Sequence, residues 1–180
     1  MEAALLVCLR GKHPVLEPTK EVSDVADQNK SDHGWLHVAK EPDVVEKEAR
    51  RRLLTAGGCL SEQGLLNFTE LQFGQHRGQT FQWLLENAMG WAVSFLRSYC
   101  REDVHNVSAF GINERKLHDY CMAIPVIAQA LDFSVRVQAA NQLAKDTGDD
   151  GHRLLEFGEY CNWSWRELCE SDKAEHVSFI

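Results

Sequence analysis

The chain has 180 residues, of which 44% are apolar and 26% charged, so it can bury a core. Its net charge of −8 repels polyphosphate and argues against strong non-specific nucleic-acid binding, while a local basic patch stays compatible with weak binding. No apolar run approaches the roughly 18 residues of a membrane span. The start, MEAALLVCL, lacks the basic region and cleavage site of a secretory signal. We therefore expect no membrane association.

Six cysteines are spread along the chain without a C-x-x-C pair. Such spacing favours free thiols in a reducing compartment over a disulfide framework. We expect an intracellular protein, and the pattern does not distinguish nucleus from cytoplasm.

Residues 10–42 are polar, contain prolines and show no sustained period, which predicts a flexible N-terminal arm over residues 1–42. A helical lead-in is expected at 43–68. Pro42 marks the start of its first helix and Gly57-Gly58 its end. Ser61 is expected to cap a short second helix that ends at Phe68.

Arg50-Arg51-Arg52 is the basic run of this lead-in. Glu46 and Glu48 precede it by one helical turn, the favourable order for ion pairs on a helix. We interpret the run as a solvated face, with a nucleic-acid or targeting role as the alternative.

Residues 69–101 are interpreted as a first module, which begins with a strand and a tight turn. Leu71 and Phe73 alternate with Gln72, as in a strand. Gly74 and Gly78 have the spacing of positive-φ positions in a hairpin or bulged turn.

A helix is expected directly after this turn. Thr80 is suited to cap it, and its apolar face follows with i, i+3, i+4 spacing. Gly90 is expected to interrupt the helix before a second apolar stripe that ends at Tyr99.

Residues 102–151 are predicted to form a helical connector. Asp103–Gly111 is expected to be a loop, and Asn113 to cap the helix after it. Pro125 should end that helix and open a longer one, which runs to about Asp146. The apolar face of the longer helix is expected to comprise Ile127, Ala130, Leu131, Val135, Ala139 and Leu143.

A second, degenerate module is expected at 152–180, where the sequence repeats the first module 84 positions later without a gap. A truncated second copy is one interpretation of this segment. Ser164 should cap its helix as Thr80 does in the first module. The identical pairs are Phe73/Phe157, Gly74/Gly158, Leu84/Leu168, Glu86/Glu170, Val93/Val177, Ser94/Ser178 and Phe95/Phe179. Phe73 and Phe157 are both expected to be buried. The predicted fold class is α+β and mostly helical, with two strand/turn–helix modules joined by helices.

A pattern F-G-x-[HY]-x-G-x-T-F, followed by a leucine-rich turn and a glycine-aromatic pair, runs through the first module. It is carried by Phe73, Gly74, His76, Arg77, Gly78, Thr80, Phe81, Gly90 and Trp91. The pattern resembles the C-terminal domain of exodeoxyribonuclease X-type proteins, and the whole chain resembles animal proteins that hold two such copies.

The resemblance implies an accessory module that occurs beside DNA-processing enzymes. It implies no catalysis, because the acidic two-metal domain of those nucleases is not present. In the second copy Glu159, Cys161 and Asn162 stand at the basic and glycine positions. If those positions contact phosphate, the second copy has lost that ability.

Four residues have the side-chain types of a zinc site: Cys100, His105, His118 and Cys121. Their spacing matches no finger class, and Cys121 lies on an apolar stripe where a buried thiol is the commoner outcome. His118 and Cys121 also share a helical face, but Asp119 is expected to point away from His118, so a nucleophilic pair lacks its orienting carboxylate. We expect no metal, no other cofactor and no enzymatic activity.

The loop from Gly74 to Gly78 is the candidate contact with a ligand or partner. His76 and Arg77 precede the helix start at Thr80, where an anion is favoured. The alternative is a purely structural turn. Trp83 and Trp91 flank the apolar face, where they either stack on bases or pack between the two copies.

The leading prediction is a non-catalytic interaction or adaptor module with a protein partner, associated with nucleic-acid processing. The alternative is a weak single-stranded nucleic-acid binder that uses the Gly74–Gly78 loop. A small metal-dependent enzyme is the most distant alternative.

Overall fold

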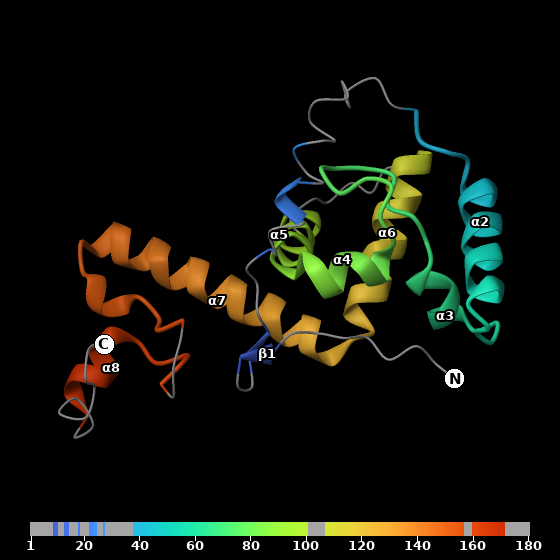
Figure 1. Ribbon diagram of the computed structural model, residues 1–180. Coiled ribbons are helices and arrows are strands. Elements are labelled where there is room, and N and C mark those ends of the chain that lie inside the picture. The colour runs from blue at the N-terminus through green and yellow to red at the C-terminus, as the bar shows by residue number, and fades with distance from the viewer. Residues whose placement is uncertain are drawn as a thin grey trace. The chain divides into compact units, whose positions relative to one another are not determined.

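The computed structural model describes residues 9–10, 13–14, 18, 22–24, 27, 38–100, 107–156 and 160–171. This part is mostly helical, as expected (Figure 1). The α+β description is not confirmed. Strand pairing in the described part is limited to β1 (Leu9–Arg10) with β2 (His13–Pro14) and two isolated bridges. The predicted N-terminal arm lies largely outside the described residues.

The chain divides into two compact units, Met1–Ala130 and Leu131–Ile180. The division falls inside a long helix of the predicted connector. Each unit is described by itself below.

The lead-in forms the two expected helices, α2 (Pro42–Thr55) and α3 (Glu62–Asn67). Proline opens α2, Gly57 follows it with φ +72°, and the Ser61 side chain accepts a hydrogen bond from the N–H of Gly64. The structure thus confirms the three expected helix-end residues. Each of them satisfies or replaces a backbone group that a helix end leaves without a partner. The residues of α2 that face the core are Val45, Ala49 and Leu53.

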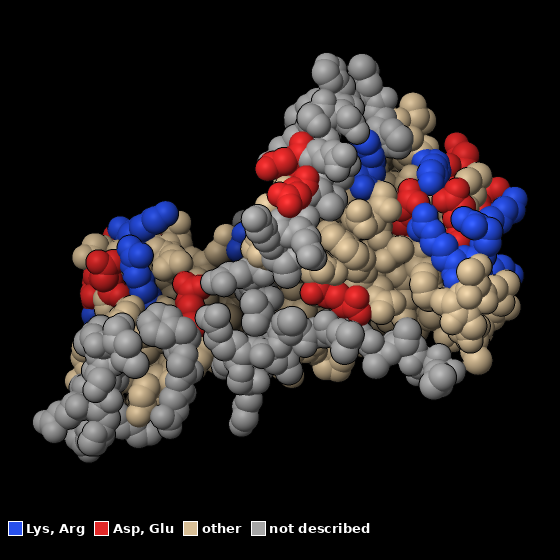
Figure 2. Space-filling model, viewed as in Figure 1, with Lys and Arg blue, Asp and Glu red and all other residues tan. Residues whose placement is uncertain are grey.

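The basic side chains of α2 are interspersed with acidic ones, as Figure 2 shows over this helix. Arg50 pairs with Glu46 at 3.4 Å, and both are exposed to solvent. Arg52 instead turns inward and pairs with Glu70 at 2.6 Å. The interpretation of this run as a solvated helix face therefore holds for Arg50. Arg52 instead binds a largely buried carboxylate.

Two helices follow the turn of the first module, α4 (Phe81–Asn87) and α5 (Met89–Tyr99). The break between them lies at Ala88, which has φ −137° and ψ 41°; the expectation that Gly90 interrupts the helix is wrong. The core side chains of α4 and α5 are Phe81, Leu84, Leu85, Met89, Ala92, Val93, Leu96 and Tyr99.

The connector contains α6 (Ala109–Met122) and α7 (Pro125–Thr147). Pro125 separates them as predicted. The cap of α6 is Ser108, whose hydroxyl accepts from the N–H of Gly111, and not Asn113, which is buried in the helix. The predicted loop at 103–111 therefore ends three residues too late, since α6 already begins at Ala109.

The apolar face expected for α7 is buried in its first half only. Ile127, Ala130 and Leu131 are buried, whereas Val135 and Leu143 are exposed. Among the described helices, none by itself has both the length and the apolar composition of a membrane span. Only α6 and α7 counted together reach them, with a bend of 101° at the break.

Tyr120 of α6 is fully buried against Phe81, with ring centroids 5.8 Å apart. Its hydroxyl has no hydrogen-bond partner among the described residues, and burial raises its pKa. We expect Tyr120→Phe to leave the free energy of unfolding unchanged or to raise it by up to about 1 kcal/mol, because it removes an unpaired buried polar group. Urea titration of both proteins measures this, and a loss above about 1 kcal/mol would reveal a partner for the hydroxyl.

The second unit contains the rest of α7, a short 3₁₀ helix (η2, Asp150–His152) and α8 (Trp165–Glu170). Ser164 caps α8 as predicted, because its hydroxyl accepts a hydrogen bond from the Glu167 N–H. The Glu167 carboxylate accepts in turn from the Ser164 N–H, which completes a capping box.

Candidate functional site

The candidate contact loop belongs to an antiparallel turn, here called the first hairpin turn (residues 69–81). Leu71 donates its N–H to Gln79 and accepts from Gly78, each at 2.8 Å. Phe81 donates to Thr69 at 2.9 Å, and an isolated bridge joins Glu70 to Thr80. The expected strand is thus reduced to a single bridge that leads directly into α4.

Both glycines of the loop have positive φ, as predicted: +69° at Gly74 and +87° at Gly78. Gly74 also lies against the indole of Trp91. A Cβ at this position would be 2.6 Å from Cζ2 of that ring, whereas a Cβ on Gly78 would meet nothing within 4 Å. Gly74 is therefore required for both its conformation and its lack of a side chain.

His76 is buried beneath this loop, with 1% of its surface exposed. Its ring centroid lies 5.3 Å from that of Trp91, edge to face, and 6.0 Å from that of Trp83. The Gln75 amide Nε2 lies 3.0 Å from His76 Nε2. Nδ1 of His76 has no hydrogen-bond partner among the described residues, and burial disfavours the charged imidazolium. His76, expected as part of the contact with a ligand or partner, is therefore buried in the fold.

Acid is expected to destabilise the fold through His76. Burial lowers its pKa below 6.5, so the unfolded chain binds a proton more readily than the folded one. The resulting stability is complete above the unfolded pKa of about 6.5 and is lost as the pH falls through the folded value.

Thermal melts of the parent and His76→Gln from about pH 7.5 to about pH 5 measure this effect. The difference in Tm between them should shrink with acidification, because the variant cannot take up the proton. Parallel pH profiles of the two proteins would contradict the assignment.

The other residues of the predicted contact are partly buried or already bonded within the module. Thr80 accepts a hydrogen bond from the N–H of Trp83 at 3.2 Å, so one donor at the start of α4 is already used. Arg77 is half-buried. Trp91 also stacks on Phe95 at 5.8 Å. Phe73 is half-buried rather than buried as expected, and Phe157 lies outside the described residues.

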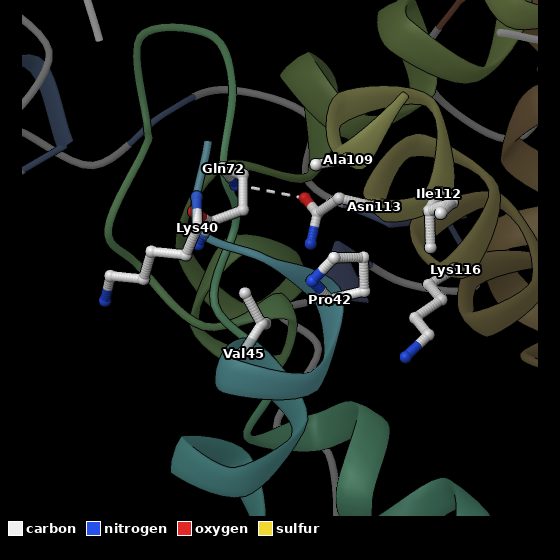
Figure 3. A pocket seen from close by; sticks show the side chains of 8 residues that line it. All are labelled: Lys40, Pro42, Val45, Gln72, Ala109, Ile112, Asn113 and Lys116. Carbon is white, nitrogen blue, oxygen red and sulfur yellow. Dashed lines mark hydrogen bonds between the residues drawn. The ribbon is translucent and has the colours of Figure 1, made fainter. Parts of the chain in front are cut away.

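An unexpected residue, Asn113 of α6, holds the outer edge of the first hairpin turn. Its Oδ1 accepts from the Gln72 N–H at 3.0 Å (Figure 3). Its Nδ2 donates to the Glu70 C=O, also at 3.0 Å. The amide thus bonds the edge as a neighbouring strand would. Asn113 is 4% exposed. The sequence offers only a polar residue inside an amphipathic helix as a signal for this role.

A small depression lies beside this bridge, lined by Lys40, Pro42, Val45, Gln72, Ala109, Ile112, Asn113 and Lys116 (Figure 3). Its volume of about 10 Å³ corresponds to a single water molecule. Small-molecule pockets are on the order of 300–1,000 Å³. The depression therefore does not serve as a substrate site.

Glu70 is the central acid of an ion-pair network. Lys40 lies 2.9 Å from Glu70 Oε1 and 2.9 Å from Glu48, and Arg52 lies 2.6 Å from Glu70 Oε2. Burial opposes the charge of Glu70, but the hydrogen bonds from Lys40 and Arg52 prevail and lower its pKa. Both carboxylate oxygens have cationic partners, so this carboxylate has a structural role.

The proposed zinc ligands are not gathered into a site among the described residues. Cys121 is buried, and burial raises its pKa to about 12, so the thiol stays protonated. Cys100 is exposed, and His105 lies outside the described residues. No group of three metal-ligating side chains occurs in the part that the structure describes.

His118 does contact a carboxylate, contrary to expectation. Its Nδ1 lies 3.0 Å from Asp119 Oδ1, and its ring packs on Tyr99 at 5.2 Å. The protonated, buried thiol of Cys121 still leaves this pair without a nucleophile.

The backbone bonds of the first hairpin turn recur 84 residues later, in the second hairpin turn (described residues 153–156 and 160–165). Leu155 donates to Trp163 at 2.7 Å and accepts from Asn162 at 3.0 Å, while Trp165 donates to Arg153 at 3.0 Å. A bridge joins Leu154 to Ser164.

The positive-φ position also recurs in the second hairpin turn. Asn162, at the position of Gly78, has φ +82°. Asparagine is one of the few residues with a side chain that adopts this conformation readily. Its Oδ1 accepts from Arg136 of α7.

The chain was compared with protein-family models, curated proteins and solved structures. No protein-family model, curated protein or solved structure matches this chain significantly. The resemblance to the exodeoxyribonuclease X C-terminal domain stays a prediction.

Proposed function

We propose that this chain is a non-catalytic interaction protein, built from two copies of one hairpin–helix module and associated with nucleic-acid processing. One observation carries the proposal: the hydrogen bonds of the first hairpin turn recur in the second, but the amide that closes the first edge has no described counterpart there. A duplicated fold with one closed and one open edge suits a scaffold that receives another protein.

The internal contacts of the first loop favour this function over nucleic-acid binding. His76 is buried, and Trp83 and Trp91, both half-buried, pack against it. Stacking on bases requires exposed aromatic faces.

Two measurements test the proposal. In an electrophoretic titration with single-stranded and duplex DNA at about 50 and 200 mM salt, we expect no shift. Quantitative affinity purification with the full chain should retain a reproducible set of proteins, and retention should depend on the folded state. A shift that weakens with salt and is lost in Arg77→Ala would replace this proposal with single-strand binding.

A further inference from the structure

The second hairpin turn has an open edge at the position where Asn113 closes the first. Leu154 and Glu156 correspond to Glu70 and Gln72. Among the described residues, neither the C=O of Leu154 nor the N–H of Glu156 has a hydrogen bond. Because Leu155 between them uses both of its backbone groups in the turn, these two groups point outward as a donor and an acceptor.

The helix after the second hairpin turn is also less covered than its counterpart. Phe81 is fully buried and contacts Tyr120 of α6, whereas Trp165 at the same position is only half-buried. Leu85 is 1% exposed, and Cys169 at its position is exposed. The open edge therefore adjoins side chains that a further helix would bury.

The charge beside this edge indicates what kind of helix fits. Glu156 replaces Gln72 and is exposed, while the nearby Arg153 and Arg166 already pair with Asp150 and Asp149. In the first unit, Lys116, one turn after Asn113, lines the depression beside Gln72 and pairs with Glu46 at 3.8 Å (Figure 3). At the equivalent place of the second hairpin turn, a basic side chain would have Glu156 as the nearby acid of the edge, which complements its charge.

We propose that Leu154–Glu156 and Trp165 form a docking surface for a helix of another protein, seated as α6 is seated on the first hairpin turn. The helix presents an asparagine amide to the two backbone groups and a basic side chain one turn later to Glu156. This inference rests on the proposed duplication and names the partner class of the interaction function.

The probe is a labelled synthetic peptide of residues 107–123, which carries the Asn113 amide and Lys116. A lactam between Lys at position 115 (Arg115→Lys) and Asp119 keeps it helical, and both positions are exposed in α6. Fluorescence anisotropy with the full chain should show saturable binding. The matched peptide with Asn113→Ala should bind at least about tenfold more weakly, because it lacks both bonds to the edge.

Two variants of the chain locate the binding. Glu156→Pro removes the free N–H, so it should weaken peptide binding at least about tenfold without changing the melt, since proline is tolerated where an edge N–H is unpaired. Glu156→Lys retains the N–H but reverses the charge that faces the peptide lysine, and it should also weaken binding. It provides the second test if Glu156→Pro fails to fold.

Absence of saturation up to about 1 mM peptide would overturn the proposal. So would equal affinity of the two peptides, or full affinity in a folded Glu156 variant. If affinity purification still retains specific proteins in that case, the docking surface is wrong and the interaction function stands. If affinity purification retains no specific protein, both the docking surface and the interaction function are wrong.

Discussion

Gly74→Ala is expected to lower the free energy of unfolding by about 2–4 kcal/mol. A side chain at φ +69° costs about 1–2 kcal/mol. The new Cβ would also lie 2.6 Å from the Trp91 ring, and such overpacking costs about 1–3 kcal/mol. The indole cannot easily yield, because it stacks on Phe95 and contacts His76. Urea or thermal unfolding measures the change.

Gly78 provides matched controls for this prediction. Gly78→Ala has the conformational cost without the clash and should lose only about 1–2 kcal/mol. Gly78→Asn should be milder still, because Asn162 occupies the corresponding position of the second hairpin turn with φ +82°. If Gly74→Ala and Gly78→Ala melt alike, the contact with Trp91 does not constrain the loop.

Asn113→Ala is expected to cost about 2–4 kcal/mol. The substitution leaves the buried Gln72 N–H without a partner and the Glu70 C=O with only the long 3.4 Å bond from Gln72 Nε2. An unsatisfied buried group costs about 1–3 kcal/mol. It also separates α6 from the edge of the first hairpin turn. Denaturant titration of the parent and the variant measures the difference.

Asn141→Ala is the matched control, since it makes the same change inside a helix. Asn141 lies in α7, and its side-chain amide has no hydrogen bond among the described residues. Its replacement should change stability by less than about 0.5 kcal/mol, with a slight gain from the helix propensity of alanine. Equal effects of the two substitutions would mean that the Asn113 bonds contribute no net stability.

Helix ends were predictable from the sequence because they depend on neighbours within a few residues. Ser61, Thr80 and Ser164 each accept a hydrogen bond from an N–H three residues later. The positive φ of Gly74 and Gly78 follows equally from a local requirement, that of a tight turn. Such interactions form in the same way in any fold that retains the segment.

Residue roles that depend on distant partners were predicted wrongly. Asn113 looks like a cap, because asparagine favours helix starts, but its amide bonds residues 41 and 43 positions away. His76 resembles a surface donor between glycines, yet the two tryptophans that follow enclose it. Nothing in the local pattern distinguishes these outcomes, because burial depends on which elements pack together.

The sequence by itself determined most of the helices, the caps at Ser61, Thr80 and Ser164, and the glycine turn with its recurrence after 84 residues. Each of these arises from backbone sterics and hydrogen bonds between near neighbours. Only the tertiary structure decided that Glu70 joins an ion-pair network, that Tyr120 is buried with an unpaired hydroxyl and that Asn113 closes one edge. Those roles depend on desolvation and on contacts across long stretches of chain, which take effect only when the helices pack.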